Sequence, residues 1–250
     1  MYYVAIDDGH GGETAGKRTP PFADGFVMGE NMYNDAVGKL LGELLKKHGF
    51  GVLFVAQEEG DTSLQTRVER ANAEKADIYI SIHANAYGNS WNSASGIESW
   101  IYGNADEKTE RLADCIQKAL VEETGRRNRG VKKSNQLYVL NSTKMPAVLV
   151  EGGFMTNFEE AELLRSEAYR RKCAVGICKG ICSYFGVAYM EKEEEDDMKR
   201  YQTIAELPYG KEVMEKLVKE GAIQGDEKGR LNLSEDMLRI FVILDRKNIL

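Results

Sequence analysis

Three short apolar runs constrain this chain most, because each leads directly to a residue that can bind a metal or move a proton. Runs of this length and composition predict buried β-strands. The runs and the residues they lead to are residues 4–7 before His10, 78–82 before His83, and 147–150 before Glu151. Ligands of open α/β sheets bind beyond the carboxyl ends of the strands. If the three strands run parallel, these residues share one edge of the sheet.

The order of the elements predicts an α/β fold, with a twisted, mainly parallel sheet flanked by helices and a small helical C-terminal module. Strands that alternate with helical patterns are typical of such sheets. Strands are expected at residues 2–7, 52–55, 78–83, 97–102, 137–140 and 147–151, and helices at 30–47, 61–75, 107–124, 157–164 and 167–185. The basic stretch 126–133 is interpreted as a solvated connector, with binding of substrate carboxylates as the alternative.

The chain is predicted to have two folded parts, residues 1–189 and 200–250, joined by an acidic linker at 190–199. An acidic run with no apolar period is solvated and extended. A unit as short as the second part is marginal alone. We therefore expect it to form a homodimer with a copy of itself, or to dock on the main domain. A helix-turn-helix is an alternative, but its basic and acidic residues nearly balance, which argues against DNA binding.

Composition excludes several classes of function. A net charge of −7 does not suit a nucleic-acid partner. The four cysteines form no Cys-x-x-Cys pair; they are interpreted as small buried apolar residues, with a metal or redox role as the alternative. His48 is interpreted as a surface residue at a helix end. Neither a leader with a basic start and an apolar core nor a membrane-length apolar run occurs, so we expect cytoplasmic synthesis without a signal peptide and no membrane insertion.

Two histidines on one sheet edge indicate a zinc site. A catalytic zinc takes three protein ligands and leaves a fourth position for water. His10 and His83 would supply two ligands, and Glu30, at the start of the helix that returns to this edge, is the predicted third. Each has a structural alternative: His10 as a turn residue, His83 as a core histidine, and Glu30 as a first-turn acid that suits the helix dipole. Glu13 competes with Glu30 as a ligand.

Glu151 follows the most apolar strand of the chain. A carboxylate in such a place is costly unless it is used or paired. The functional interpretation is a general base that takes a proton from the attacking water and passes it to the leaving nitrogen. The structural alternative is an ion pair with an arginine such as Arg67.

Five segments in one order carry a resemblance to a known family. They are VAIDDGHGG at residues 4–12, GEN at 29–31, SLQTRVERAN at 63–72, SIHANA at 81–86 and MPAVLVEGGFMTN at 145–157. Together they resemble the zinc-dependent N-acetylmuramoyl-L-alanine amidases of the type-3 amidase family, over residues 1–186. One departure is Asp8, where the family commonly has Pro.

The resemblance implies a twisted α/β sheet and one Zn²⁺ held by His10, Glu30 and His83, with Glu151 as the catalytic residue. It implies cleavage of the amide between N-acetylmuramic acid and L-alanine in peptidoglycan of a Gram-positive bacterium. Residues 14–20 resemble phage and prophage endolysins, which are made in the cytoplasm and act on the wall after release. Such enzymes carry wall-binding modules, so the resemblance implies cell-wall binding for residues 200–250, with dimerisation as the alternative. The alternatives are a host autolysin, another zinc peptidase or deacetylase, and a non-catalytic cell-wall-binding protein.

Overall fold

The computed structural model describes all residues except 13, 57–59, 191–199, 227–229, 248 and 250. The chain divides into two compact units, Met1–Met190 and Glu191–Leu250, and each is described by itself. The predicted acidic linker falls almost wholly outside the described residues, and so does Glu13. Among the described helices, none is both long and apolar enough to cross a bilayer.

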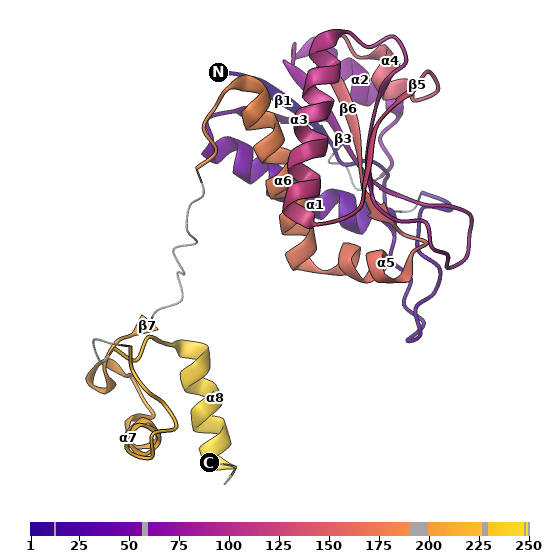
Figure 1. Ribbon diagram of the computed structural model, residues 1–250. Helices are drawn as coiled ribbons and strands as arrows, with labels where there is room; N and C mark the ends of the chain where they lie inside the picture. The colour runs from indigo at the N-terminus through magenta and orange to yellow at the C-terminus, as the bar shows by residue number, and fades with distance from the viewer. Residues whose placement is uncertain (13, 57–59, 191–199, 227–229, 248, 250) are drawn as a thin grey trace. The chain divides into compact units, whose positions relative to one another are not determined.

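The first unit is an α/β domain whose six strands form one sheet (Figure 1). Its strands are β1 (Tyr3–Asp7), β2 (Gly51–Phe54), β3 (Ile78–Asn85), β4 (Ile97–Tyr102), β5 (Asn128–Ser134) and β6 (Ala147–Phe154). Its helices are α1 (Glu30–Lys47), α2 (Leu64–Ala73), α3 (Glu107–Thr124), α4 (Tyr138–Ser142), α5 (Phe158–Arg165) and α6 (Glu167–Phe185).

The strand order is β2-β1-β3-β6-β4-β5. The four strands from β2 to β6 run parallel, whereas β4 is antiparallel to β6, and β5 is parallel to β4. The predicted α/β class with a mainly parallel sheet is confirmed. The three strands that lead to the predicted site residues, β1, β3 and β6, are adjacent and parallel, so their carboxyl ends form one edge.

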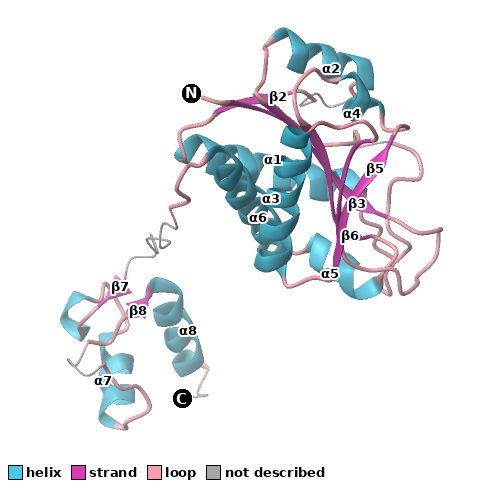
Figure 2. Cartoon of the chain, turned by 45° about the horizontal axis from the view of Figure 1, so that its top comes forward, coloured by secondary structure: helices cyan, strands magenta, loops and turns pink. Residues whose placement is uncertain are grey.

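Helices cover both faces of the sheet (Figure 2). Ile78, Ile80 and Ile82 of β3 pack into the larger core with residues of α1, α3 and α6. Tyr79, which alternates with them, packs into a smaller core with residues of α2 and α4. Because successive side chains of a strand point to opposite faces, His83 shares the α2–α4 face with Tyr79. The site therefore opens on that side of the sheet.

Two elements differ from the sequence predictions. The stretch expected to be a basic connector contains β5, which pairs along one side with β4 at the sheet edge. Charged side chains are common on edge strands because they discourage further pairing. The strand expected at residues 137–140 is instead α4, with Val139 and Leu140 buried. A helix of five residues is too short to show helical periodicity.

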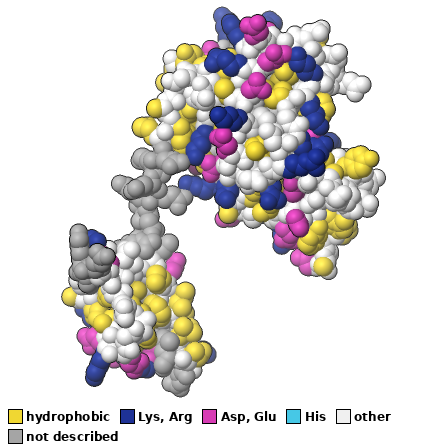
Figure 3. Space-filling model, in the orientation of Figure 1, with side chains coloured by type: hydrophobic (Ala, Val, Ile, Leu, Met, Phe, Trp, Pro, Cys, Tyr) yellow, Lys and Arg dark blue, Asp and Glu magenta, His cyan; other side chains and the backbone are white. Residues whose placement is uncertain are grey.

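The second unit has its own small core, with the elements β7 (Arg200–Tyr201), η1 (Ile204–Glu206), α7 (Lys211–Lys219), β8 (Leu233–Ser234) and α8 (Glu235–Arg246). Ser234 caps α8 by accepting a hydrogen bond from the Met237 amide. The pairing of β7 with β8 was not predicted. Met237, Ile240 and Ile243 of α8 are exposed, and hydrophobic side chains gather on the visible face of this unit (Figure 3).

Candidate metal and catalytic site

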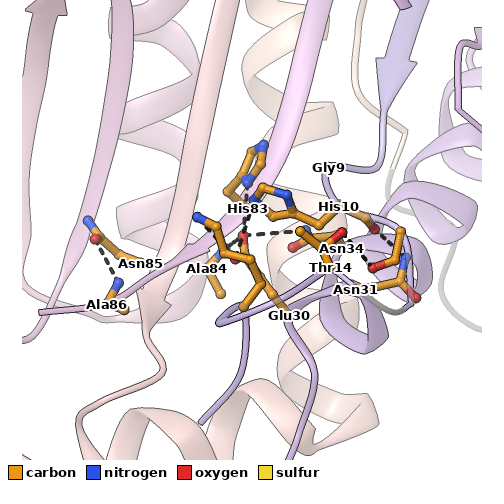
Figure 4. A network of polar contacts seen from close by, with 12 residues as sticks. Gly9, His10, Thr14, Glu30, Asn31, Asn34, His83, Ala84, Asn85 and Ala86 are labelled. Atoms are coloured by element: carbon orange, nitrogen blue, oxygen red, sulfur yellow. Dashed lines mark hydrogen bonds and ion pairs between the residues drawn. The ribbon is translucent and has the colours of Figure 1, made fainter. Parts of the chain in front are cut away.

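His10, Glu30 and His83 converge at the carboxyl edge of the parallel strands (Figure 4). His10 lies in the loop after β1, Glu30 is the first residue of α1, and His83 lies on β3. Glu30 bridges the imidazoles: its Oε1 is 2.8 Å from His83 Nδ1, and its Oε2 is 3.6 Å from His10 Nε2. One potential ligand atom from each residue lies within 4.8 Å of the other two.

Local sequence explains how His10 reaches this position. Gly9 has a φ of 69°, and a Cβ there would lie 2.7 Å from the backbone oxygen of Ile82. Only glycine adopts this conformation at so close an approach. The Gly9 amide donates to Asp7 Oδ1, and Asn31 Nδ2 donates to the His10 carbonyl oxygen. These bonds hold the turn that brings the imidazole over the end of β3.

Glu30 is 2% exposed, and its neighbours keep it ionised. Burial alone would raise the pKa of this carboxyl, but the hydrogen bond with His83 and the charges of both imidazoles lower it below its usual value. Burial lowers the pKa of His10 to about 4. For His83 the contacts with Glu30 outweigh burial and raise the pKa. An ionised carboxylate and a neutral imidazole are the forms that bind a metal cation. The pKa shifts of Glu30 and His10 favour these forms, whereas His83 must release a proton to bind an ion.

Glu151 pairs with His83 in the register of β3 and β6. Its Oε2 is buried, and no described residue donates a hydrogen bond to it. Burial raises the pKa of this carboxyl to about 7, and the charges of Glu30 and Glu98 add to the shift while His83 opposes it. A carboxyl that titrates near neutral pH suits proton transfer. The predicted alternative of an ion pair with Arg67 is wrong, because Arg67 bonds to Asp7 and Asp61.

A cavity of about 520 Å³ joins these groups. His10, His83 and Glu151 line it together with residues of α2 and α4, while Glu30 is not among its lining residues. Its volume is typical of sites that enclose a ligand. The cavity thus holds both imidazoles and the carboxyl group on one continuous surface.

A buried polar network contacts the His83 ring at Nε2, the nitrogen that does not face Glu30. The sequence did not predict this network. Asp7 accepts hydrogen bonds from Arg67 Nη1, Tyr79 Oη and Ser81 Oγ. Ser81 Oγ is also 3.2 Å from His83 Nε2. Because Ser81 donates its proton to Asp7, its oxygen can accept a hydrogen bond from His83 Nε2, while His83 Nδ1 donates to Glu30 Oε1. Loss of the Nδ1 proton would leave that nitrogen free to bind a metal ion, with the ring still held by Ser81. The available signal was that Asp7 and Ser81 both interrupt apolar strands; the structure shows that they are register partners.

The donor set fits a divalent metal ion. Two imidazole nitrogens and one carboxylate oxygen are ligands that catalytic zinc sites use. The unpartnered Glu151 oxygen beside them leaves a polar group in the cavity for a water or substrate atom. The structure brings all four predicted residues together, and their individual roles stay predictions.

Comparison with known proteins gives the family. The family model described as N-acetylmuramoyl-L-alanine amidase, Amidase_3, matches residues 4–183. This chain belongs to that amidase family. YqiI of Bacillus subtilis, an uncharacterized protein, is 39% identical over 183 residues, which are 73% of this chain and 84% of YqiI. The N-acetylmuramoyl-L-alanine amidase LytC of the same organism is 38% identical over 187 residues, covering 73% of this chain and 35% of LytC.

Solved structures agree with the family assignment. The N-acetylmuramoyl-L-alanine amidase of Clostridium difficile 630 is 34% identical to this amidase, with a TM-score of 0.68 over 74% of this chain and 97% of that one. The catalytic domain of CwlV from Bacillus (Paenibacillus) polymyxa is 29% identical, with a TM-score of 0.67. The predicted peptidoglycan amidase is therefore confirmed at the level of the family, and its substrate is peptidoglycan.

Proposed function

We propose that this amidase is zinc-dependent and hydrolyses the amide bond between N-acetylmuramic acid and L-alanine. His10, Glu30 and His83 would hold the ion, and Glu151 would be the general base. The observation that carries the proposal is that Glu151 Oε2 is buried and has no hydrogen-bond donor among the described residues. Glu151 is the register partner of His83, and it lines the same cavity as both imidazoles. Structural carboxylates are paired when buried, so an unpaired one beside a metal-type donor set indicates chemistry.

The protein groups divide the work between binding and proton transfer. When bound, a zinc ion acts as a Lewis acid and lowers the pKa of water. Glu151 takes a proton from the attacking water and delivers it to the nitrogen of the departing L-alanine, since its pKa near 7 allows both steps. Ser81 and Asp7 hold the His83 ring in place. The walls formed by α2 and α4 bring the scissile amide to Glu151.

Digestion of purified sacculi tests the bond that is cut. We expect new L-alanine amino termini, no new reducing sugars, and a loss of activity on chelation that Zn²⁺ restores. Release of reducing sugars would instead assign a glycosidase, and hydrolysis that survives complete metal removal would exclude the metal mechanism. Product analysis also separates the amidase from a peptidase, which cuts within the stem peptide, and from a deacetylase, which releases acetate.

For the biological setting we propose the prophage endolysin expected from residues 14–20, acting on a Gram-positive wall after cytoplasmic synthesis. Host autolysins are the alternative, and relatives include a germination-specific and a sporulation-specific amidase of Bacillus subtilis. Expression with and without a co-expressed holin separates the two. Lysis only when the holin is present supports the endolysin, whereas release to the wall without a holin supports the autolysin.

A further inference from the structure

A second cluster of metal-type ligands lies at the other end of α1. His48 follows the last residue of α1, and Cys178 and Cys182 lie one turn apart on α6. One ligand atom from each residue lies within 4.8 Å of the other two, and Cys178 Sγ is 4.0 Å from His48 Nδ1. His48 was predicted to be a surface residue, but it is only partly exposed, and both thiols are buried.

The cluster is separate from the amidase site. Glu30 begins α1 and His48 follows its end, and 18 helical residues span roughly 27 Å at about 1.5 Å each. None of the three residues lines the amidase cavity. Any ion bound here is therefore a different ion from the one proposed at His10, Glu30 and His83.

The spacing of the three atoms suits a metal ion. The three atoms lie within 4.8 Å of one another. An ion at their centre would therefore lie at most about 2.8 Å from each, and a small inward movement brings this to the usual Zn–S bond length of about 2.3 Å. The two thiols are also close enough to share a hydrogen bond. The two thiols thus need little rearrangement to face one ion, whereas His48 must give up its bond to the Leu44 carbonyl.

The charges of the three ligands also favour a divalent, thiophilic metal ion. A divalent cation with two thiolates and a neutral imidazole is an uncharged unit, which is the form that burial tolerates. Thiolate and imidazole ligands select zinc and other thiophilic metals over magnesium or calcium. We propose that His48, Cys178 and Cys182 form a second metal site, for Zn²⁺ or a chemically similar thiophilic divalent cation. The three residues supply one ligand fewer than a closed structural zinc site has. The ion should therefore exchange more readily than in a four-ligand site.

Occupation of this site exchanges hydrogen bonds for metal bonds. In the structure His48 Nδ1 donates to the Leu44 carbonyl at 2.8 Å, and Nε2 accepts from the Met190 amide at 3.1 Å. When Nδ1 binds the ion, its proton moves to Nε2, which can then no longer accept from Met190. Each binding event also releases the two thiol protons to solvent. The metal therefore displaces the Met190 amide, at the end of the first unit.

Titration of the reduced, metal-free full chain with Cd²⁺ tests the proposal. We expect an ultraviolet thiolate-to-cadmium charge-transfer band, with the release of two protons for each ion that produces it. The band distinguishes this site from the amidase site, whose proposed ligands include no thiol. The double variant His10→Ala/His83→Ala should therefore keep the band while it loses the ion proposed at the amidase site. A failure of the second-site proposal can thus be told apart from a failure of the amidase mechanism.

Matched variants locate the band. Cys182→Ser should abolish it, whereas Cys115→Ser, which removes a thiol outside the cluster, should leave it unchanged. His48→Gln keeps both thiols and should raise the Cd²⁺ concentration at half-saturation by about tenfold or more; it serves as the second probe if Cys182→Ser does not fold. Absence of the band in the parent chain, or its persistence unchanged in both cluster variants, would overturn the proposal.

Hydrogen exchange at the Met190 amide gives an independent check. Because Cd²⁺ on Nδ1 removes the acceptor of that amide, exchange at Met190 should become faster when the metal is bound. Unchanged or slower exchange in the metal-loaded chain would contradict the proposed ligation through Nδ1.

Discussion

At the scale of single residues, Glu151 differs in how it is paired from three buried carboxylates of the first unit, Asp7, Glu98 and Glu160. Asp7 accepts from Arg67, Glu98 from Arg129, and Glu160 from the amides of Gly96 and Phe154. Among the described residues, Glu151 Oε2 is the one shielded carboxylate oxygen without a donor. Such a group destabilises the fold, so it is expected to be kept for a purpose other than stability.

Glu151→Gln should therefore separate chemistry from folding. The amide keeps the shape and removes the base, so we expect kcat to fall by about 10²- to 10⁴-fold, with zinc stoichiometry unchanged and thermal stability equal or higher. Turnover of a muramoyl-peptide substrate, metal analysis and thermal unfolding measure the three quantities. Glu159→Gln, at an exposed position of α5, is the matched control and should leave all three unchanged. Loss of zinc in Glu151→Gln would make this residue a ligand instead.

Ser81 is a positioning residue between the Asp7 carboxylate and the His83 ring, at 2.8 Å and 3.2 Å. Partners of this kind typically contribute about 10- to 100-fold to metal affinity. We expect Ser81→Ala to weaken zinc binding by about tenfold, measured by competition with a chelator, with little change in the amount of folded protein. Ser99→Ala is the control, because Ser99 is an equally buried strand serine that bonds to Gln117 away from the site. Equal affinities for the two variants would show that Ser81 does not orient the ring.

The sequence was informative about residues at strand ends and uninformative about the network behind them. His10, His83 and Glu151 were recognisable because polar residues after apolar strands are conspicuous. The pairing of Arg67 with Asp7 was not recognisable, because it depends on which face of α2 meets β1. A single sequence shows that Arg67 lies on a helix but does not show its partner, so the wrong carboxylate was chosen.

At the scale of elements, α3 and α6 approach each other through glycines. A Cβ on Gly176 would lie 2.7 Å from Leu120 Cα, and one on Gly180 would lie 2.5 Å from Ile116 Cα. These are backbone atoms that cannot move without the helix. The glycines of α6 therefore set the distance between the two helices that cover one face of the sheet.

Gly180→Ala should force α3 and α6 apart. Overpacking of this kind costs about 1–3 kcal/mol, which outweighs the better helix propensity of alanine. Gly38→Ala on α1 is the matched control: its new Cβ would meet its nearest neighbour at 3.5 Å, an ordinary contact, so stability should stay equal or rise. Urea denaturation of both variants measures the difference. A Gly180→Ala protein as stable as the parent would show that the helices can separate at no cost.

The sequence did not predict β5 or α4, because what defines these elements is their contact with neighbouring elements and not a periodic pattern of their own. The strand β5 carries Arg129, Lys132 and Lys133, which resemble a connector until β4 is seen beside it. Lys132 and Arg129 are also positioned by Glu98, which pairs with Glu151 across β4 and β6. The long helices and the buried strands, whose periodicity is internal, were predicted correctly.

At the scale of the whole molecule, the chain combines two units with separate cores. The two larger hydrophobic clusters consist of residues up to Tyr189, and the third consists of residues from Tyr201 onward. All residues that line the amidase cavity belong to the first unit. The cavity thus lies wholly in the first unit, so the contribution of the second unit can be measured separately.

Truncation after Met190 should leave chemistry intact and weaken binding to the wall. Because the cavity and its supporting network are complete in residues 1–190, kcat/KM on a soluble muramoyl peptide should change by less than about twofold. If the second unit binds the wall, as expected from the sequence, its removal should weaken retention on insoluble walls by about 10²-fold, the usual gain from a tethered module. Co-sedimentation with purified walls measures retention. Equal retention of the two forms would contradict wall binding and favour self-association through the exposed residues of α8. Sedimentation velocity would then show a dimer for the full chain and a monomer for the truncated form.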